Sequence, residues 1–262
     1  MPADCWCGGC HPRPSAVDCP ARQRTVGTVI RFFRATEREF DRGHFRERHR
    51  TRRDPNHAEP LAPGLDALAG IDEIRLRPGA HASADAPGDS DIVTYVRRGG
   101  LTCTDASGLT RTARAGEFQM TGAELGLRCI ARNASPTEWV QYFHLALRGG
   151  SSEPVQGQAR CFSGADRGGR LCLVASGDAG QGVMRLRQNA RIYSATLAEG
   201  NHLVHELAAG RCAWLYMVAG SAALRDRLLR AGDSAAIAVE RAVSFTARQA
   251  TEVLLLDLGD PV

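Results

Sequence analysis

Short apolar segments separated by glycine and small polar residues follow one another from Ile71 onward, and hardly any of them keeps a helical period. The clearest segments have close to the usual length of a strand. They are DIVTYV (91–96), GEFQM (116–120), LGLRCIA (125–131) and WVQYFHLAL (139–147). This pattern predicts an all-β protein with few short helices.

An internal repeat is the strongest structural signal in the chain, because three motifs of the first half return in the same order in the second half. The pairs are TYVRRGG (94–100) with LYMVAGS (215–221), RAGEFQM (114–120) with RAGDSAA (230–236), and TEWVQYFHLAL (137–147) with TEVLLLDL (251–258). Two copies in one order predict two similar modules.

A glycine lies near the end of the first motif in each copy, where the chain must turn sharply and a positive φ costs glycine little. Strands that close on themselves hide their edges. We therefore expect two tandem β-barrels of the jelly-roll type. The expected boundaries are residues 25–148 for the first barrel, 149–168 for a glycine- and serine-rich connection, and 169–262 for the second barrel.

Composition fits a globular protein, since 43% of the residues are hydrophobic and 24% are charged. All 33 basic residues are arginine, and the net charge is only +4. The arginine run FRERHRTRRD (45–54) lacks an aromatic stacking platform, so we expect a solvated surface and no nucleic-acid partner.

The chain has no run of about 18 apolar residues and no signal-peptide pattern, which predicts a cytoplasmic protein without a membrane segment. A monomer is expected.

The first 24 residues are rich in cysteine, and five of them could gather around zinc. These are Cys5, Cys7, Cys10, His11 and Cys19. Their spacing lacks the two paired knuckles that mark zinc modules. We therefore expect residues 1–24 to form a poorly ordered tail rather than a zinc site.

Three long stretches together resemble the pirin-like bicupins, the group that includes bacterial quercetin 2,3-dioxygenases, and the resemblance covers about residues 27–262. They are TYVRRGGLTCTDASGLTRTARAGEFQMTGAELGLR, VHELAAGRCAWLYMVAG and TEVLLLDLGDPV. The signatures RGH (42–44) and DPN (54–56) agree with it as well. The resemblance implies two stacked cupin barrels, with one divalent metal in the N-terminal barrel. It also implies three histidines and a glutamate as ligands, from an H-x-H pair and a later H-x-E pair.

The implied ligand positions have changed in this chain. The H-x-H pair falls on Asp85 and Pro87, and the H-x-E pair falls on Cys129 and Ala131. Proline and alanine cannot coordinate, and two remaining ligands of altered type would hold a metal poorly. We expect no cofactor, and if one binds, a single divalent metal in the N-terminal barrel.

Neighbouring residues could replace the lost metal ligands, so that His81 and Cys103 would form a rebuilt metal site together with Asp85 and Cys129. Cys103 faces the barrel lumen if it keeps the alternation that starts at Tyr95. Free buried cysteines are the competing interpretation. In the second barrel, His202 and His205 are three residues apart, so they do not share a strand face and are expected to be a surface or hydrogen-bonding pair.

Two functions are favoured at this point over a third, a transcription cofactor, which would rest on the arginine run from Arg46 to Arg53. The first is a pirin-like bicupin with a degenerate metal site and a non-catalytic binding, regulatory or paralogous role, in which the N-terminal barrel takes a small apolar or aromatic ligand. The alternative is a metal-dependent quercetin 2,3-dioxygenase-like oxidoreductase using a rebuilt site. Its general base would come from Glu124 or Asp85, because the family's glutamate position is Ala131.

Overall fold

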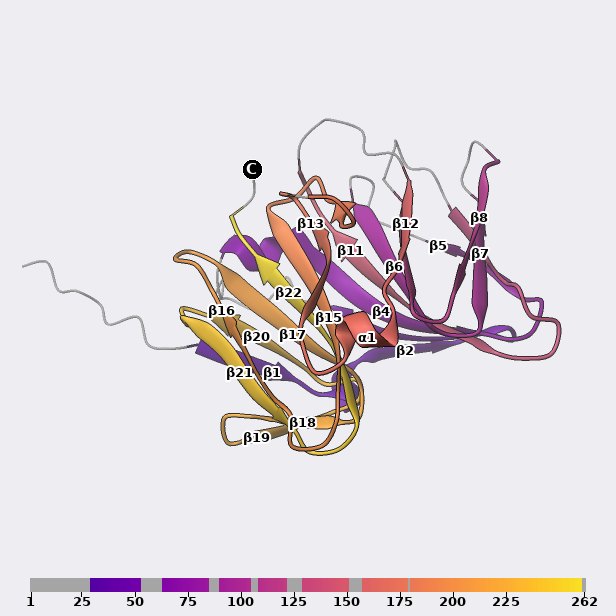
Figure 1. Ribbon diagram of the computed structural model, residues 1–262. Coiled ribbons are helices and arrows are strands. Elements are labelled where there is room, and N and C mark those ends of the chain that lie inside the picture. Colours follow the sequence, from indigo (N-terminus) through magenta and orange to yellow (C-terminus); the bar gives the residue numbers. More distant parts are fainter. Residues whose placement is uncertain are drawn as a thin grey trace, which may run out of the picture.

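Two β-modules of the same design build the protein (Figure 1). The computed structural model describes residues 29–52, 63–84, 90–104, 108–121, 129–150, 157–178 and 180–260. Each module pairs a seven-stranded sheet with a four-stranded sheet. The helical elements in these ranges are short: η1 (Ala35–Glu37), η2 (Pro63–Ala67) and α1 (Gly164–Arg167).

The first module has a large sheet and a small sheet. In spatial order the large sheet contains β12 (Gln158–Cys161), β9 (Glu117–Thr121), β6 (Asp91–Arg98), β11 (Val140–Leu147), β4 (Leu68–Leu76), β3 (Arg46–Arg52) and β2 (Glu39–Arg42). The small sheet contains β5 (His81–Ala84), β10 (Cys129–Asn133), β7 (Gly100–Thr104) and β8 (Thr110–Arg114).

The second module repeats this plan except in the last two strands at one edge of its large sheet, which pair in parallel rather than antiparallel. Its large sheet contains β1 (Val29–Phe33), β20 (Ser234–Ala238), β17 (Cys212–Ala219), β22 (Thr251–Leu258), β15 (Ala190–Leu197), β13 (Cys172–Ser176) and β14 (Met184–Arg185). Its small sheet contains β16 (His202–Glu206), β21 (Ala242–Ala247), β18 (Ser221–Leu224) and β19 (Arg227–Arg230). The predicted all-β class and internal repeat are therefore confirmed.

The outer strands of the two large sheets are exchanged between the modules. Strand β1 precedes the first module in the chain but pairs with β20 of the second, from Val29 opposite Ala238 to Phe33 opposite Ser234. Strand β12 precedes the second module but pairs with β9 of the first. The expected boundaries placed residues 29–33 in the first barrel and residues 158–161 in the connection. A strand's periodicity does not identify its partner, so the sequence contained no sign of this exchange.

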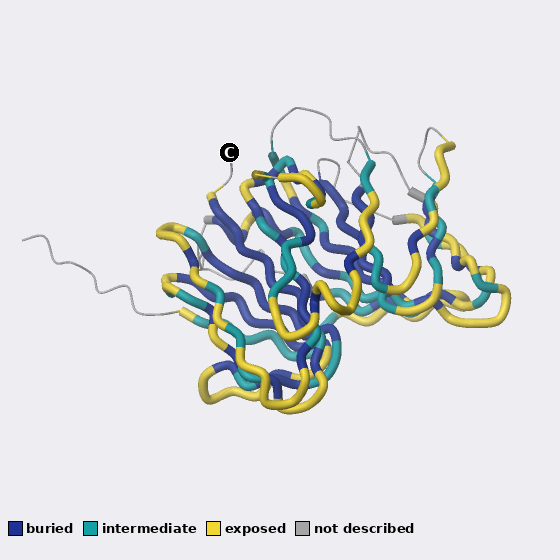
Figure 2. The backbone as a smooth tube through the Cα atoms, in the orientation of Figure 1, coloured by how far each residue is buried: buried dark blue, intermediate teal, exposed yellow. Residues whose placement is uncertain are grey.

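The largest core cluster lies between the two large sheets, where Figure 2 shows the buried strands of both modules meeting. Tyr95 of β6 stacks on Phe118, with ring centroids 4.5 Å apart. Phe143 of β11 meets Tyr216 of β17 at 5.9 Å. Smaller clusters fill the interior of each module. Alternate residues of β6 and β11 therefore face either the other module or the lumen of their own module.

Residues 46–52 of the arginine run form strand β3, and Arg48 and Arg50, two positions apart, both contact the carboxylate of Asp72. Arg48 is only 8% exposed and pairs with Asp72, which also accepts from Arg50 Nε at 3.1 Å. The expectation of a solvated surface is therefore wrong for these two arginines. A strand period of two turned them toward the half-buried carboxylate of Asp72. Within the described ranges, no helix has the length and apolar character needed to cross a membrane.

Candidate functional site

Of the four ligand positions implied by the resemblance, two lie in the part of the chain that the structure describes. Cys129 begins β10 and pairs with Ala84, and Ala131 follows two residues later. Asp85 and Pro87 lie outside the described residues, as do Glu124, residues 1–24 and the signature at 54–56.

A row of three paired residues crosses the small sheet of the first module at Ala131. Ala131 is directly opposite Ala82 on β5 and Cys103 on β7. Paired residues share one face of a sheet, and these three pack in the same apolar cluster of the first lumen. Ala131 is fully buried, and Cys103 is 7% exposed and accepts a hydrogen bond from Gln119 Nε2.

The chemistry of this row does not fit a catalytic metal. Two of its side chains are methyl groups, and the third is a thiol that already accepts an amide hydrogen bond. A site for iron, nickel, copper or manganese needs several nitrogen or oxygen donors that converge. No cluster of three or more histidine, cysteine, aspartate or glutamate side chains suited to a metal occurs among the residues that the structure describes.

His81 lies on the other face of the sheet from this row. It pairs with Arg132, one position away from the pair of Ala82 and Ala131, and it is exposed. The structure therefore does not bring His81 to Cys103. Cys103 does line the first lumen, but Tyr95 faces the other module, so the alternation expected to link them is wrong.

A bulge in β6 explains that error. On the neighbouring strand β11, Gln141 is opposite Arg98 while Tyr142 is opposite Val96, so Arg97 is an extra residue without a partner. One inserted residue moves every later side chain to the opposite face. Strand β17 has the same irregularity at the equivalent place in the second module.

The first lumen also holds a buried histidine that sequence reasoning missed. His144 on β11 is 7% exposed, is opposite Asp72 and Thr94, and lies 4.9 Å from the ring of Tyr142. Burial lowers the pKa of His144 to about 4; the charge of Asp72 opposes this shift and that of Arg48 adds to it. The imidazole is therefore neutral at physiological pH and is a weak base. Its only signal was a polar residue within the apolar segment 139–147.

The histidines of the second module are hydrogen-bonded, as expected. His202 Nδ1 lies 2.9 Å from Thr246 Oγ1, and His205 Nε2 lies 2.9 Å from Asp257 Oδ2. His202 is exposed and His205 is half-buried on β16. The bonds from His205 and Arg211 lower the pKa of Asp257 against the effect of its burial.

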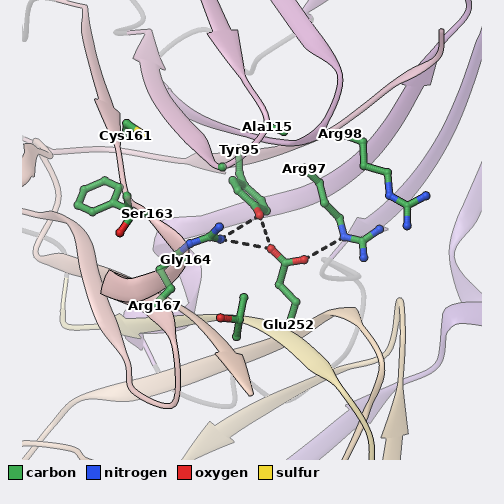
Figure 3. A pocket seen from close by; sticks show the side chains of 12 residues that line it. Tyr95, Arg97, Arg98, Ala115, Cys161, Ser163, Gly164, Arg167 and Glu252 are labelled. Atoms are coloured by element: carbon green, nitrogen blue, oxygen red, sulfur yellow. Dashed lines mark hydrogen bonds and ion pairs between the residues drawn. The ribbon is translucent and has the colours of Figure 1, made fainter. Parts of the chain in front are cut away.

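A second candidate site is a cavity of about 360 Å³ between the modules, called here the inter-module pocket (Figure 3). Glu252 of β22 accepts hydrogen bonds there from the Tyr95 hydroxyl, from Arg97 Nε at 2.9 Å and from Arg167 Nη1 at 3.3 Å. Burial raises the pKa of the Tyr95 hydroxyl, and the negative charge of Glu252 raises it further. Sequence reasoning used Glu252 only as part of a repeat motif and missed this network.

Comparison with known proteins relates the chain to one group. Residues 173–258 match the family model described as "Quercetinase C-terminal cupin domain". The "Pirin-like protein" of Caulobacter vibrioides is 31% identical over 172 residues, which are 64% of this chain and 73% of that protein. "Quercetin 2,3-dioxygenase" of Escherichia coli K12 is 29% identical over 203 residues, 78% of this chain and 87% of that protein. The crystal structure of the bacterial pirin YhhW from Escherichia coli in complex with nickel(II) is 28% identical, has a TM-score of 0.74, and covers 89% of this chain and 100% of its own.

Proposed function

Because the chain belongs to the pirin-like cupin family, we propose that it is a binding or regulatory member whose first module has a degenerate metal site and no metal-dependent catalysis. The nickel complex of YhhW identifies metal binding as a property of that relative.

The single observation that carries the proposal is the burial of Ala131 among apolar side chains. The implied carboxylate ligand is here a methyl group with no exposed surface, and its neighbours across the sheet are Ala82 and Cys103. Position 131 therefore belongs to the apolar lining of the lumen. Ile74, Leu76 and Val140 belong to the same cluster, which favours a small apolar or aromatic ligand in the first module over an ionic one.

Metal analysis of the full chain purified without chelator tests the proposal. We expect far less than one iron, nickel, copper or manganese per chain by plasma mass spectrometry. The matched control restores the implied ligands through Asp85→His, Pro87→His, Cys129→His and Ala131→Glu, and this variant is expected to retain nickel. One equivalent of any of the four metals in the unaltered chain would contradict the proposal.

A second candidate function follows from one specific similarity. The relative named "Quercetin 2,3-dioxygenase" matches this chain over 203 residues. The alternative is therefore a metal-dependent quercetin 2,3-dioxygenase-like oxidoreductase with a rebuilt site. An aerobic assay with quercetin, with and without added divalent metals, separates the two. Loss of quercetin absorbance that depends on enzyme concentration would favour the oxidoreductase.

A further inference from the structure

The inter-module pocket has an excess of positive charge. Arg97, Arg98 and Arg167 line it, and Glu252 is the one carboxylate among its described lining residues. Three guanidinium groups against one carboxylate leave a net charge of +2. Like charges that share a cavity repel one another, and a low-dielectric wall strengthens that repulsion.

Glu252 neutralises only part of this donor set. Arg167 donates hydrogen bonds to Tyr95, Ser194 and Glu252 through Nη1, while its Nε is buried without a hydrogen-bond partner in the described ranges. Arg97 uses Nε for Glu252 and Nη1 for Gln141. In the described parts of the chain, Arg97 Nη2 has no protein acceptor.

Arg98 makes fewer side-chain interactions than Arg97 and Arg167. It is exposed, and no hydrogen bond or ion pair joins its side chain to any residue in the described ranges. It lines both the inter-module pocket and a second cavity of about 250 Å³, which Trp139 and Gln141 also line. Figure 3 shows the side chains of Arg97 and Arg98 extending in the same general direction, with Arg97 between Arg98 and Glu252 in this view.

The bulge in β6 explains how two consecutive residues reach one pocket. Neighbouring residues of a regular strand point to opposite faces, but Arg97 is the extra, unpaired residue of the bulge. The equivalent bulge of β17 carries Val218 and Ala219 instead. The bulge therefore belongs to the architecture of both modules, whereas the arginine pair occurs only in the first.

We propose that the inter-module pocket binds a small molecule through a carboxylate or phosphate group, held by Arg97 and Arg98 with Arg167 as the buried positive charge behind them. Arginine presents a planar fork of donors that suits both oxyanions. The volume lies within the range of small-molecule sites. This site is separate from the lumen of the first module, so it does not depend on the proposed function.

Calorimetric titration of the full chain with inorganic phosphate and, separately, with citrate tests the proposal and distinguishes the two oxyanions. We expect saturable binding of at least one of them, weakened about tenfold by Arg98→Gln because a charge-assisted hydrogen bond is lost. Arg97→Gln should weaken it similarly. Arg241→Gln removes the same charge from an exposed arginine outside the pocket and should leave affinity unchanged.

Two results would overturn the proposal. One is no heat of binding with either anion up to about 10 mM, a concentration that would detect even millimolar affinity. The other is equal weakening by Arg98→Gln and Arg241→Gln, which would mean that net charge alone attracts the anion. Circular dichroism of each variant verifies that it is folded, and Arg98 is exposed, so its replacement should not disturb the fold.

Discussion

Replacing Glu252 with glutamine should destabilise the contact between the two modules. The Glu252 carboxylate is the only acceptor shared by Tyr95, Arg97 and Arg167 in the described pocket. Glutamine keeps the shape of the side chain but replaces one oxygen with an NH₂ group. In either orientation of the amide, that group faces an arginine donor, and the two guanidinium groups lose their counter-charge.

The contacts of Glu252 set the size of the effect. Removing one member of a buried ion pair costs about 3–5 kcal/mol, and a hydrogen bond to a charged group contributes about 1.5–3 kcal/mol. The Glu252 side chain is 13% exposed, so we take the lower end, about 3 kcal/mol. For a chain of this size each kcal/mol lowers Tm by about 2–4 °C. The predicted loss is therefore about 6–12 °C.

Differential scanning calorimetry of the unaltered chain, Glu252→Gln and a surface control measures this loss. The control is Asp178→Asn, because Asp178 is 79% exposed and pairs with Arg191 at 3.1 Å. An exposed pair contributes only about 0–1 kcal/mol, so Tm should change little. If Glu252→Gln lost no more than Asp178→Asn, the network would not join the modules energetically, and the reasoning would be refuted.

Three further predictions concern other parts of the fold. The pKa of the His144 imidazole is 6.5 in the unfolded chain and about 4 in the folded protein, so the free energy of unfolding should fall by about 3 kcal/mol as pH drops from about 6.5 to 4. His144→Gln should flatten the dependence of Tm on pH, and an unchanged profile would contradict this. Gly220→Ala should lower Tm far more than Gly200→Ala in thermal melts. Both glycines have φ near +80°, but a new Cβ would lie 2.2 Å from a backbone oxygen at Gly220 and would have no atom within 4 Å at Gly200. Equal losses of Tm would exclude the steric contribution. Phe143→Ala in the core between the sheets should cost about 3–5 kcal/mol in urea unfolding, whereas Phe40→Ala, at a side chain 52% exposed, should cost under about 1 kcal/mol.

The fold could be predicted from the sequence because its signals are local and repeated. Alternation and glycine positions locate β6, β9 and β11, and their second copies locate β17, β20 and β22. The exchange of β1 and β12 could not be predicted, since which sheet edge a terminal strand joins depends on contacts distant in sequence.

The candidate site was less predictable, for a related reason. The implied ligand positions could be carried over residue by residue, and the pairing of Ala131 with Cys103 agrees with a shared lumen. The bulge at Arg97 inverted the expected alternation after Tyr95. The network around Glu252 joins residues as far apart as 157 positions, and no local pattern signals it.

Nickel titration measures whether the first module holds a metal, and the methyl groups of Ala82 and Ala131 lead us to expect that it does not. Isothermal calorimetry should detect no stoichiometric nickel binding to the unaltered chain, and one-to-one binding to the variant with histidines at positions 85, 87 and 129 and glutamate at 131. Tight one-to-one nickel binding by the unaltered chain, lost on replacing Cys129 or Cys103, would contradict the account and establish a rebuilt site.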